Sequence, residues 1–329
     1  MEKLLEIKNL TTSFRIEGEY HAAVDNVSLD VNKNEVFAIV GESGSGKSAM
    51  ALSISRLLNP NYSKSEGSIL FNGQDLISLK EKDLNKVRGA GIGMIFQDPL
   101  SALNPLMRIG AQIEETLNYH TTFTKVQKKE RAIELLTQVG MVNPALTYDQ
   151  YPHELSGGMR QRAMIATAIA AKPQLIIADE PTTALDVTIQ AQILDLLRDL
   201  QKETGSSIII ITHDLGVVAE IADRVAVMYA GQIVELAPVD ELFNNPKHPY
   251  TRSLLDAMPT TASDNDRLHA IEGLVPPLQD IVREGCRFAP RIPWVAESEH
   301  ETAPTYHEIS ENHVVLCTCY KNFELREYK

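Results

Sequence analysis

The segment GESGSGKS at residues 41–48 constrains the fold more than any other part of the chain. Residues 35–40, which are apolar after Glu35, precede it and predict a buried strand, and the spaced apolar side chains of residues 48–58 predict a helix. A glycine-rich turn between strand and helix points backbone N–H groups at an anion. Lys47 then reaches the outer phosphates of a nucleotide, and Ser48 binds a magnesium ion. The sequence therefore predicts a nucleotide-binding α/β fold.

The same glycines have a second interpretation, the dinucleotide-binding fingerprint, which Gly44, Gly46 and Ala49 also fit. That fingerprint gives no role to Lys47 and Ser48. It also requires an acidic residue closing a second strand about 20 residues later, and the sequence has none at that place. We therefore prefer the phosphate loop.

Two adjacent carboxylates follow a short apolar segment. Residues 175–178 are typical of a central parallel strand, and Asp179 and Glu180 come directly after them. Open α/β sheets bind ligands at the carboxyl ends of their strands. We expect Asp179 to hold magnesium, directly or through water, and Glu180 to orient or deprotonate the attacking water. A helix cap or solvated turn is the ordinary role of such a pair, but the intact phosphate loop favours catalysis.

Two more polar residues follow predicted strands. His213 comes after the β-branched segment 207–211, where its imidazole could bind the outer phosphate or hold Glu180 and water in line. Gln97 follows the segment 91–96 and precedes a proline that must break regular structure. Its amide suits contact with magnesium or water, and a simple turn residue is an equally good interpretation.

A second glycine-containing helix start lies at Ser156-Gly157-Gly158, within LSGGMRQR at residues 155–162. Residues 159–171 predict the helix that follows. A serine cap and two glycines make an anion site. Because the phosphates of one nucleotide are already cradled at residues 41–48, we expect the second site to serve the nucleotide of another copy. This predicts a dimer with two nucleotides at its interface, closed when they are bound.

Composition excludes several function classes. The 329 residues carry 31 basic and 44 acidic side chains, a net charge of −13, which argues against capture of nucleic acid or anionic lipid. The longest apolar stretch, at residues 163–171, falls far short of the roughly 18 residues that span a membrane. The N-terminus has no signal-peptide pattern, and the three cysteines fit a reducing compartment, so we expect a cytosolic chain.

The motifs together resemble those of ABC transporter ATP-binding subunits over about residues 4–260. Residues 41–48 resemble the Walker A motif, Gln97 the Q-loop, residues 155–162 the signature, residues 175–180 the Walker B motif, Ala184-Leu185-Asp186 the D-loop, and His213 the switch histidine. The resemblance implies ATP and Mg²⁺ as cofactors. It also implies the P-loop NTPase fold of ABC type, with a mostly parallel sheet and an N-terminal antiparallel β subdomain.

The resemblance implies a role for each matching residue. Glu180, His213 and Gln97 would be catalytic, and Ser48, Gln97 and Asp179 would contact the metal. Adenine would stack on an aromatic residue of the first strand, with Phe14 the best fit and Tyr20 the alternative. The ATP-binding set would be Phe14, Gly41, Glu42, Ser43, Gly44, Ser45, Gly46, Lys47, Ser48 and Ala49, and the set that contacts the partner's ATP would be Ser156, Gly157, Gly158 and Asp186. Asp186 would also communicate between the two sites.

Three longer segments narrow the resemblance to ATPases of dipeptide and oligopeptide importers, nearest to their D-type subunits. They are FQDPLSALNP at residues 96–105, YPHELSGGMRQR at 151–162 and HPYTRSLLDAMP at 248–259. The likeness implies a location on the cytoplasmic face of the cell membrane and no nucleic-acid partner. The expected partners are a second related ATPase, two membrane permease subunits and an extracytoplasmic peptide-binding protein.

We predict three parts along the chain. The ATPase core comprises residues 1–97 and 171–240, an inserted helical subdomain that carries the signature comprises residues 98–170, and a small extension comprises residues 241–329. Nine of the 16 prolines lie from Pro238 onward, so the extension should be rich in loops. We expect it to regulate the enzyme or to stabilise its dimer.

Some relatives hold an iron–sulfur cluster on four cysteines of this extension. Here Cys286 and Cys317 fall at two of those positions, whereas Ile292 and Glu299 occupy the others. Cys319 is additional. Because a four-thiolate cluster needs four suitably placed ligands, we do not expect an iron–sulfur cluster.

Alternative functions stay open at this point. A soluble ABC ATPase acting in translation or DNA repair would share the motifs, although the single cassette and the peptide-type extension argue against it. A nucleotide sensor that does not hydrolyse is disfavoured by intact Glu180 and His213. The cargo could also be nickel or another solute, since importers of such solutes share the extension.

Overall fold

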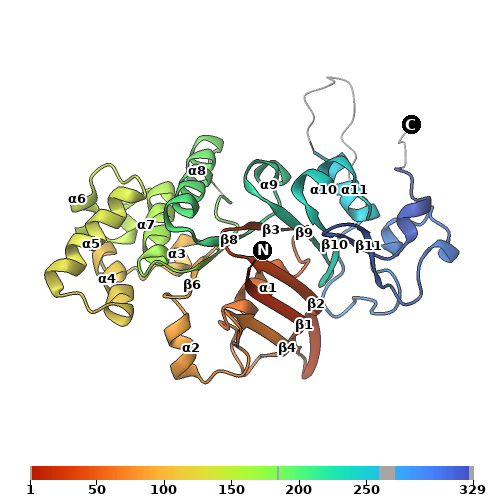
Figure 1. The fold of residues 1–329 in the computed structure, drawn as a ribbon, viewed down its shortest axis with the longest axis horizontal. Coiled ribbons are helices and arrows are strands. Elements are labelled where there is room, and N and C mark those ends of the chain that lie inside the picture. Colours follow the sequence, from red (N-terminus) through yellow and green to blue (C-terminus); the bar gives the residue numbers. More distant parts are fainter. Residues whose placement is uncertain (1, 184, 259–270, 326–329) are drawn as a thin grey trace. The chain divides into compact units, whose positions relative to one another are not determined.

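The computed structural model describes residues 2–183, 185–258 and 271–325 (Figure 1). The chain forms two compact units, each built from separated segments. The first comprises Met1–Leu5, Asp30–Val36 and Phe71–Ile211, and the second comprises Glu6–Leu29, Phe37–Leu70 and Thr212–Lys329. Each unit is described by itself. No helix of the described residues has the length and apolar character needed to cross a membrane.

The first unit contains a parallel sheet whose strand β7 (Leu175–Asp179) lies between β6 (Ile92–Ile95) and β8 (Ser207–Thr212). Leu175 pairs with Ile92 on one side and with Ser207 on the other. All residues of β7 and β8 are buried, as expected for parallel strands covered on both faces. The carboxylates after the apolar segment therefore lie at the carboxyl edge of this sheet.

Four helices pack together in the same unit (Figure 1), namely α4 (Ile109–His120), α5 (Lys125–Gln138), α6 (Pro144–Asp149) and α7 (Gly157–Ile169). A capping box between Thr124 and Gln127 starts α5, and Leu135 and Leu136 bury its apolar face. Helix α7 begins at Gly157 rather than at the predicted residue 159. The reason is that the Ser156 hydroxyl accepts the Met159 N–H and brings both glycines into the first turn.

The first unit also contains the short strand β5 (Gln74–Asp75). Its other helices are α2 (Glu81–Val87), α3 (Pro99–Ala102), α8 (Val187–Thr204) and the 3-10 turn η1 (Pro152–Glu154).

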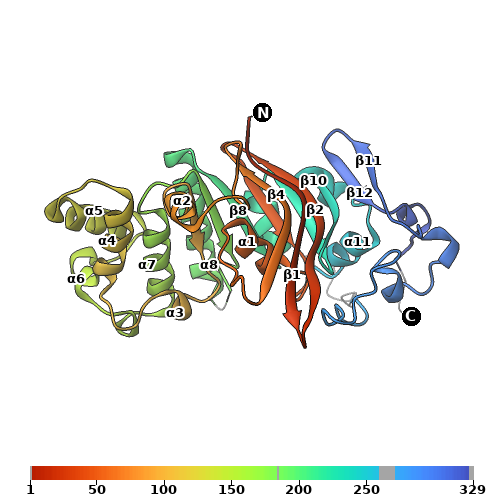
Figure 2. The same cartoon turned by 90° about the horizontal axis from the view of Figure 1, so that it is seen from below.

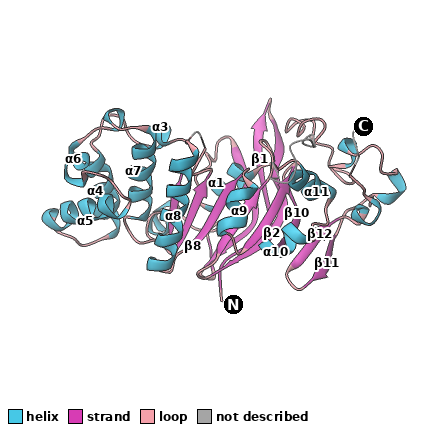
Figure 3. Cartoon of the chain, turned by 90° about the horizontal axis from the view of Figure 1, so that it is seen from above, coloured by secondary structure: helices cyan, strands magenta, loops and turns pink. Residues whose placement is uncertain are grey.

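The second unit contains a mixed sheet in the order β3-β9-β10-β12-β11. Strand β3 runs parallel to β9, with Val40 opposite Val227, and the remaining neighbours are antiparallel. The last two strands come from the C-terminal extension, which thus adds a hairpin to the sheet (Figure 3). A separate sheet has the order β2-β1-β4, and Figure 2 shows these strands side by side.

The strands assigned to the second unit, some of which begin or end in the first, are β1 (Lys3–Ile16), β2 (Glu19–Asn32), β3 (Val36–Val40), β4 (Ser63–Phe71), β9 (Arg224–Tyr229), β10 (Gln232–Pro238), β11 (Tyr306–Ser310) and β12 (His313–Leu316). Its helices are α1 (Lys47–Ile54), α9 (Leu215–Ile221), α10 (Val239–Asn244) and α11 (Pro249–Asp256), with the 3-10 turns η2 (Ala289–Arg291), η3 (Glu297–Glu299) and η4 (Cys319–Asn322).

Helix α1 is shorter than predicted, because it ends at Ile54 and not near residue 58. Arg56 takes a left-handed conformation with φ 54°. The Leu57 N–H then turns back to the carbonyl of Leu52, at 2.9 Å. This is the hydrogen bond that closes a Schellman-type helix end.

The buried carboxylate of Glu235 joins β10 to the extension. It accepts the backbone N–H groups of Lys247 and His248 at 2.7 and 2.9 Å. The Nε2 of His313 on β12 lies 2.8 Å from the same carboxylate and donates to it. Glu235 and His313 are both 0% exposed, so these donors have no water as a substitute acceptor.

We expect Glu235→Leu to lower the free energy of unfolding by about 3 kcal/mol or more, because three buried donors lose their acceptor. Urea unfolding followed by circular dichroism measures the change. Glu241→Gln is the matched control. That carboxylate is half-exposed, and its distance of 3.9 Å from His313 Nδ1 is too long for a hydrogen bond. We expect it to cost less than about 0.5 kcal/mol. Equal losses in the two variants would contradict the role of Glu235.

Candidate functional site

The loop between β3 and α1 has a backbone that excludes side chains at two glycines. Gly41 has φ 151° and Gly46 has φ 106°. A Cβ on Gly41 would lie 2.1 Å from the carbonyl oxygen of Met228, and one on Gly46 would lie 2.3 Å from that of Ala23. Since both obstacles are backbone atoms, they cannot rotate away. The loop therefore needs glycine at both positions, as the motif predicts.

Lys47 is the first residue of α1 and is 5% exposed. Its ammonium donates to the carbonyls of Gly41 and Glu42 at 2.7 and 2.9 Å. The charge is thus held between the loop and the first turn of α1. An ammonium and the positive end of a helix dipole at one place form an electropositive cradle that fits a phosphate group.

The remaining loop residues divide into a buried and an exposed set. Ser45 is buried, and its carbonyl accepts the Gly231 N–H at 2.9 Å. Ser43, Gly44 and Ser48 are exposed, whereas Ala49 is half-buried. Ser48 is therefore an exposed residue in the first turn of α1, where a magnesium ligand is expected.

The C-terminal extension holds the loop through Glu42, a contact that the motifs do not reveal. The Glu42 N–H donates to the Tyr250 hydroxyl at 2.8 Å. The Glu42 carboxylate accepts from both terminal nitrogens of Arg291 at 2.6 and 3.2 Å. Arg291 also donates to the carbonyls of the adjacent residues Glu272 and Gly273, so one guanidinium joins the loop to this segment of the extension.

An aromatic cluster of Tyr229, Tyr250 and Phe288 supports this contact. Its ring centroids lie 4.7 to 5.3 Å apart in tilted and edge-on arrangements. The Arg291 guanidinium lies 5.8 Å from the Tyr229 ring centre. Burial raises the pKa of the Tyr250 hydroxyl well above its ordinary value, so it stays neutral and can accept from Glu42. Tyr250 lies in the segment at residues 248–259 that the sequence singles out, but no local pattern predicts its contact with the distant Glu42.

His213 follows β8 and is exposed. It lines a pocket of about 110 Å³ with Gly41, Glu42 and Leu254. The next residue, Asp214, caps α9 by accepting the Gly216 N–H at 2.8 Å. His213 therefore lies beside the phosphate loop, and its role as a sensor of the outer phosphate stays a prediction.

In the first unit, Gln97 and Glu180 come together as the sequence predicts for a shared site. The Gln97 amide donates to a Glu180 carboxylate oxygen at 2.9 Å. The Thr183 hydroxyl donates to the same oxygen at 2.8 Å, a contact that sequence reasoning missed. Asp179 is the last residue of β7 and is 5% exposed.

The backbone at Glu180 separates the two carboxylates. Glu180 has φ 47°, in the left-handed region, and its N–H donates to the Ile211 carbonyl at 2.8 Å. Such a conformation is costly for a residue with a side chain, and it persists only where surrounding contacts hold it. It turns the chain sharply after Asp179, so adjacent carboxylates can serve different tasks.

The start of α7 is bound to the segment that follows Glu180. Gln161 donates to the Pro181 carbonyl at 2.6 Å, and a Cβ on Gly158 would lie 3.1 Å from a methyl group of Ile189. Asp186 caps α8 by accepting the Ile189 N–H at 3.0 Å. Ser156 and Gly157 are exposed, and Ala184 of the predicted D-loop lies outside the described residues. The roles of these residues toward a partner's nucleotide stay predictions.

The two candidates for adenine stacking differ in exposure. Phe14 on β1 is half-buried. Tyr20 on β2 is 44% exposed, and the ammonium of Lys64 lies 5.0 Å from its ring centre. The choice between them stays a prediction.

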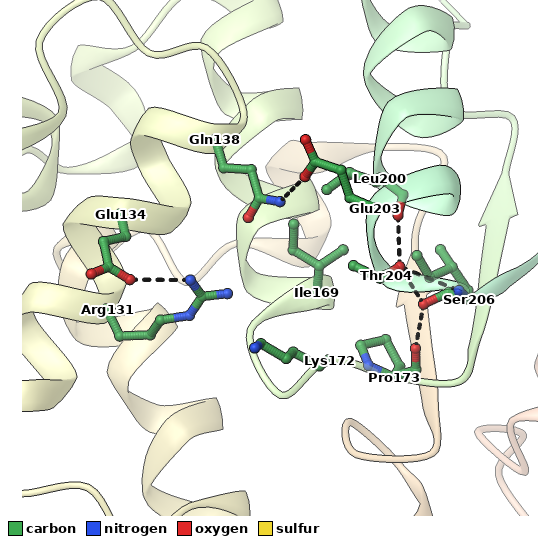
Figure 4. A pocket seen from close by; sticks show the side chains of 11 residues that line it. Arg131, Glu134, Gln138, Ile169, Lys172, Pro173, Leu200, Glu203, Thr204 and Ser206 are labelled. Carbon is green, nitrogen blue, oxygen red and sulfur yellow. Dashed lines mark hydrogen bonds and ion pairs between the residues drawn. The ribbon is translucent and has the colours of Figure 1, made fainter.

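A pocket of about 390 Å³ in the first unit contains none of the predicted residues (Figure 4). It is lined by α5, α7 and α8 and lies beside the amino ends of β7 and β8. Several of its polar groups bind one another: Arg131 donates to Glu134, and the amide of Gln138 donates to Glu203. Because open α/β sheets bind ligands at the carboxyl ends of their strands, we assign it no ligand.

Comparisons with known proteins agree with this geometry. Residues 24–183 match the family described as ABC transporter, and residues 234–297 match the one described as oligopeptide/dipeptide transporter, C-terminal region. The chain is 51% identical, over 100% of its length and 97% of the relative's, to the oligopeptide transport ATP-binding protein OppD of Lactococcus lactis subsp. cremoris. It is 52% identical to OppD of Bacillus subtilis, over 95% of this chain and 88% of the relative.

A solved structure shows the same fold. It is the dimeric structure of a post-hydrolysis state of an ATP-binding cassette bound to ADP and Pi. The sequences are 30% identical, the TM-score is 0.65, and the match covers 71% of this chain and 98% of that one. The predicted fold class is therefore confirmed.

We expect Arg291→Met to weaken ATP binding about ten-fold, roughly 1.4 kcal/mol, because Glu42 loses the group that fixes the loop. Titration of the purified chain with ATP measures the affinity. Arg252→Met is the matched control. Arg252 lies in the same extension, and its guanidinium donates to the carbonyls of Pro246 and Phe323 rather than to the loop. An equal loss of affinity in both variants would contradict a specific effect of Arg291.

Proposed function

This chain belongs to the family of ABC transporter ATP-binding proteins of the oligopeptide and dipeptide type, and on that basis we propose that it is the ATP-hydrolysing subunit of a peptide importer. Oligopeptides or dipeptides are the cargo. The identity to peptide-transport ATPases along the whole chain supports this, as does the match of the extension at residues 234–297.

In this proposal the phosphate loop binds the triphosphate. Backbone N–H groups of residues 41–49 and the ammonium of Lys47 contact the phosphates, and Phe14 stacks on adenine. Ser48, Asp179 and Gln97 are the expected ligands of Mg²⁺, all of them oxygen donors of the kind this ion prefers. When bound, the ion neutralises charge on the outer phosphates. The exposure of Ser48 and the fixed ammonium of Lys47 support these roles.

Hydrolysis is assigned to Glu180. The observation that carries this assignment is the carboxylate held by Gln97 and Thr183 at the carboxyl edge of β7. A carboxylate fixed in this way can orient a water molecule and accept its proton as the water attacks the outer phosphate. His213 then senses that phosphate or steadies the water.

A second ATPase completes the site in this proposal. Ser156, Gly157 and Gly158 contact the ATP that the other subunit binds, and Asp186 lies at the same interface. The exposure of Ser156 and Gly157 supports this role, because another molecule can reach exposed residues. Binding of ATP closes the interface, and hydrolysis loosens it.

The complete importer also contains two membrane permease subunits and an extracytoplasmic peptide-binding protein. The ATPase is peripheral in this assembly and lies on the cytoplasmic face of the cell membrane. The negative charge of the chain supports attachment through the permease subunits rather than through anionic lipid.

The test is reconstitution of the chain in vesicles with its permease subunits and partner ATPase. We expect Glu180→Gln to lower ATP hydrolysis by about 100-fold or more and to stop peptide uptake, because an amide cannot accept the water's proton. ATP affinity should stay within about two-fold of that of the unmodified chain, because the amide oxygen can still accept hydrogen bonds. Phosphate release, uptake of labelled peptide and ATP titration are the measurements.

Glu203→Gln is the matched control, since it alters an exposed carboxylate of α8 in the same unit. It should leave all three measurements unchanged. Peptide uptake that continues undiminished in Glu180→Gln would show that the proposal is wrong.

A further inference from the structure

The C-terminal extension brings together four side chains that commonly bind metal ions. They are Cys286, His300, Cys317 and Cys319, and their ligand atoms all lie within 4.8 Å of one another. The residues come from three separate stretches. Cys286 precedes η2, His300 follows η3, Cys317 comes directly after β12, and Cys319 is the first residue of η4. Their meeting is therefore a product of the fold.

The four groups are shielded from solvent to different degrees. Cys317 and Cys319 are each 1% exposed, and Cys286 is partly buried. All three are free thiols. The Nδ1 of His300 is buried and has no hydrogen-bond partner among the described residues. A buried polar atom without a partner is unfavourable, and coordination of a metal would remove that cost.

The backbone places the cysteines with some strain. Cys317 has φ 71°, which is rare for a residue with a side chain. Its N–H donates to the Thr305 carbonyl at 3.1 Å, and the carbonyl of Cys286 accepts the Ala289 N–H at 3.0 Å. Left-handed residues cluster at ligand sites, where the surrounding structure holds them.

We propose that Cys286, His300, Cys317 and Cys319 form a structural zinc site. Three thiolates and one imidazole are an established tetrahedral ligand set for Zn²⁺. With Zn–S bonds of about 2.3 Å, ligand atoms of a tetrahedral site lie roughly 3.8 Å apart, so the donors need only small movements to bind one ion. The site is closed, with no position left for substrate, and it supplies no catalytic step.

The geometry favours one ion over an iron–sulfur cluster. In a four-iron cluster each protein ligand binds a different iron atom, so the ligands must stand well apart around it. The donors here are close together, and one of them is an imidazole. At the two other positions expected for cluster cysteines, Ile292 is 1% exposed in the apolar interior and Glu299 is not a thiol. His300 is the fourth donor that the cysteine count alone could not identify.

Zinc would fix the segment that carries two arginines whose contacts lie outside the extension. One residue after Cys286, Arg287 donates to the Ala230 carbonyl and to Asp25. Arg291, in the following turn, contacts Glu42 of the phosphate loop. A metal that fixes Cys286 to the β12 turn would therefore stabilise the extension where it meets the loop.

The experiment measures zinc in the purified full chain by elemental analysis. We expect about one zinc ion per chain. His300→Gln and Cys319→Ser should each weaken zinc retention about ten-fold or more in competition with a chelator and lower the thermal unfolding midpoint. His307→Gln is the matched control, because His307 lies in the same extension but pairs with Glu301 at 2.6 Å. It should retain zinc as the unmodified chain does.

A second measurement does not depend on how the variants fold. Cobalt added to the metal-free chain should give the visible absorption of a tetrahedral, thiolate-bound ion. A chain that binds neither zinc nor cobalt would overturn the proposal. So would iron and sulfide in the purified protein, or zinc retention equal in His300→Gln and His307→Gln.

Discussion

The backbone turn between β3 and α1 is the constraint on which the rest of the site depends. Carbonyl oxygens of Ala23 and Met228 occupy the space that side chains at Gly46 and Gly41 would need. Met228 belongs to β9, the strand that pairs with β3. The neighbouring strand therefore shapes the phosphate loop, as does the loop's own sequence. A change in the β3–β9 register would move the cradle as well as the sheet, which links the packing of the core to nucleotide binding.

The parts that could be predicted are those encoded locally. Strands β3, β7 and β8 are continuous apolar segments, and Ser156 marks a helix start whose exact first residue differed by two positions. The end of α1 could not be predicted, because arginine is not a residue type that favours the left-handed conformation that Arg56 adopts. The partners of Glu42 could not be predicted either. Tyr250 and Arg291 lie 208 and 249 residues away, and a short pattern says nothing about contacts at that separation.

The carboxylate pair shows how adjacent acidic residues obtain different surroundings. Asp179 ends a fully buried strand, whereas the left-handed backbone of Glu180 redirects the chain at the next residue. Gln97 and Thr183 then fix the Glu180 side chain. The order of residues predicts that both lie at the strand end. It does not predict the turn, because that conformation is unfavourable for glutamate and exists only through the tertiary contacts around it.

The C-terminal extension supports the phosphate loop, although it is rich in prolines and loops. Its hairpin continues the sheet of the second unit, and buried Glu235 binds the backbone before α11 and the imidazole of His313. Tyr250 on α11 then reaches the phosphate loop. Loop-rich segments bury too little apolar surface to hold such positions by packing alone. Buried polar contacts, an aromatic cluster and a metal-binding set of thiols are the interactions that can make this extension a rigid support for the loop.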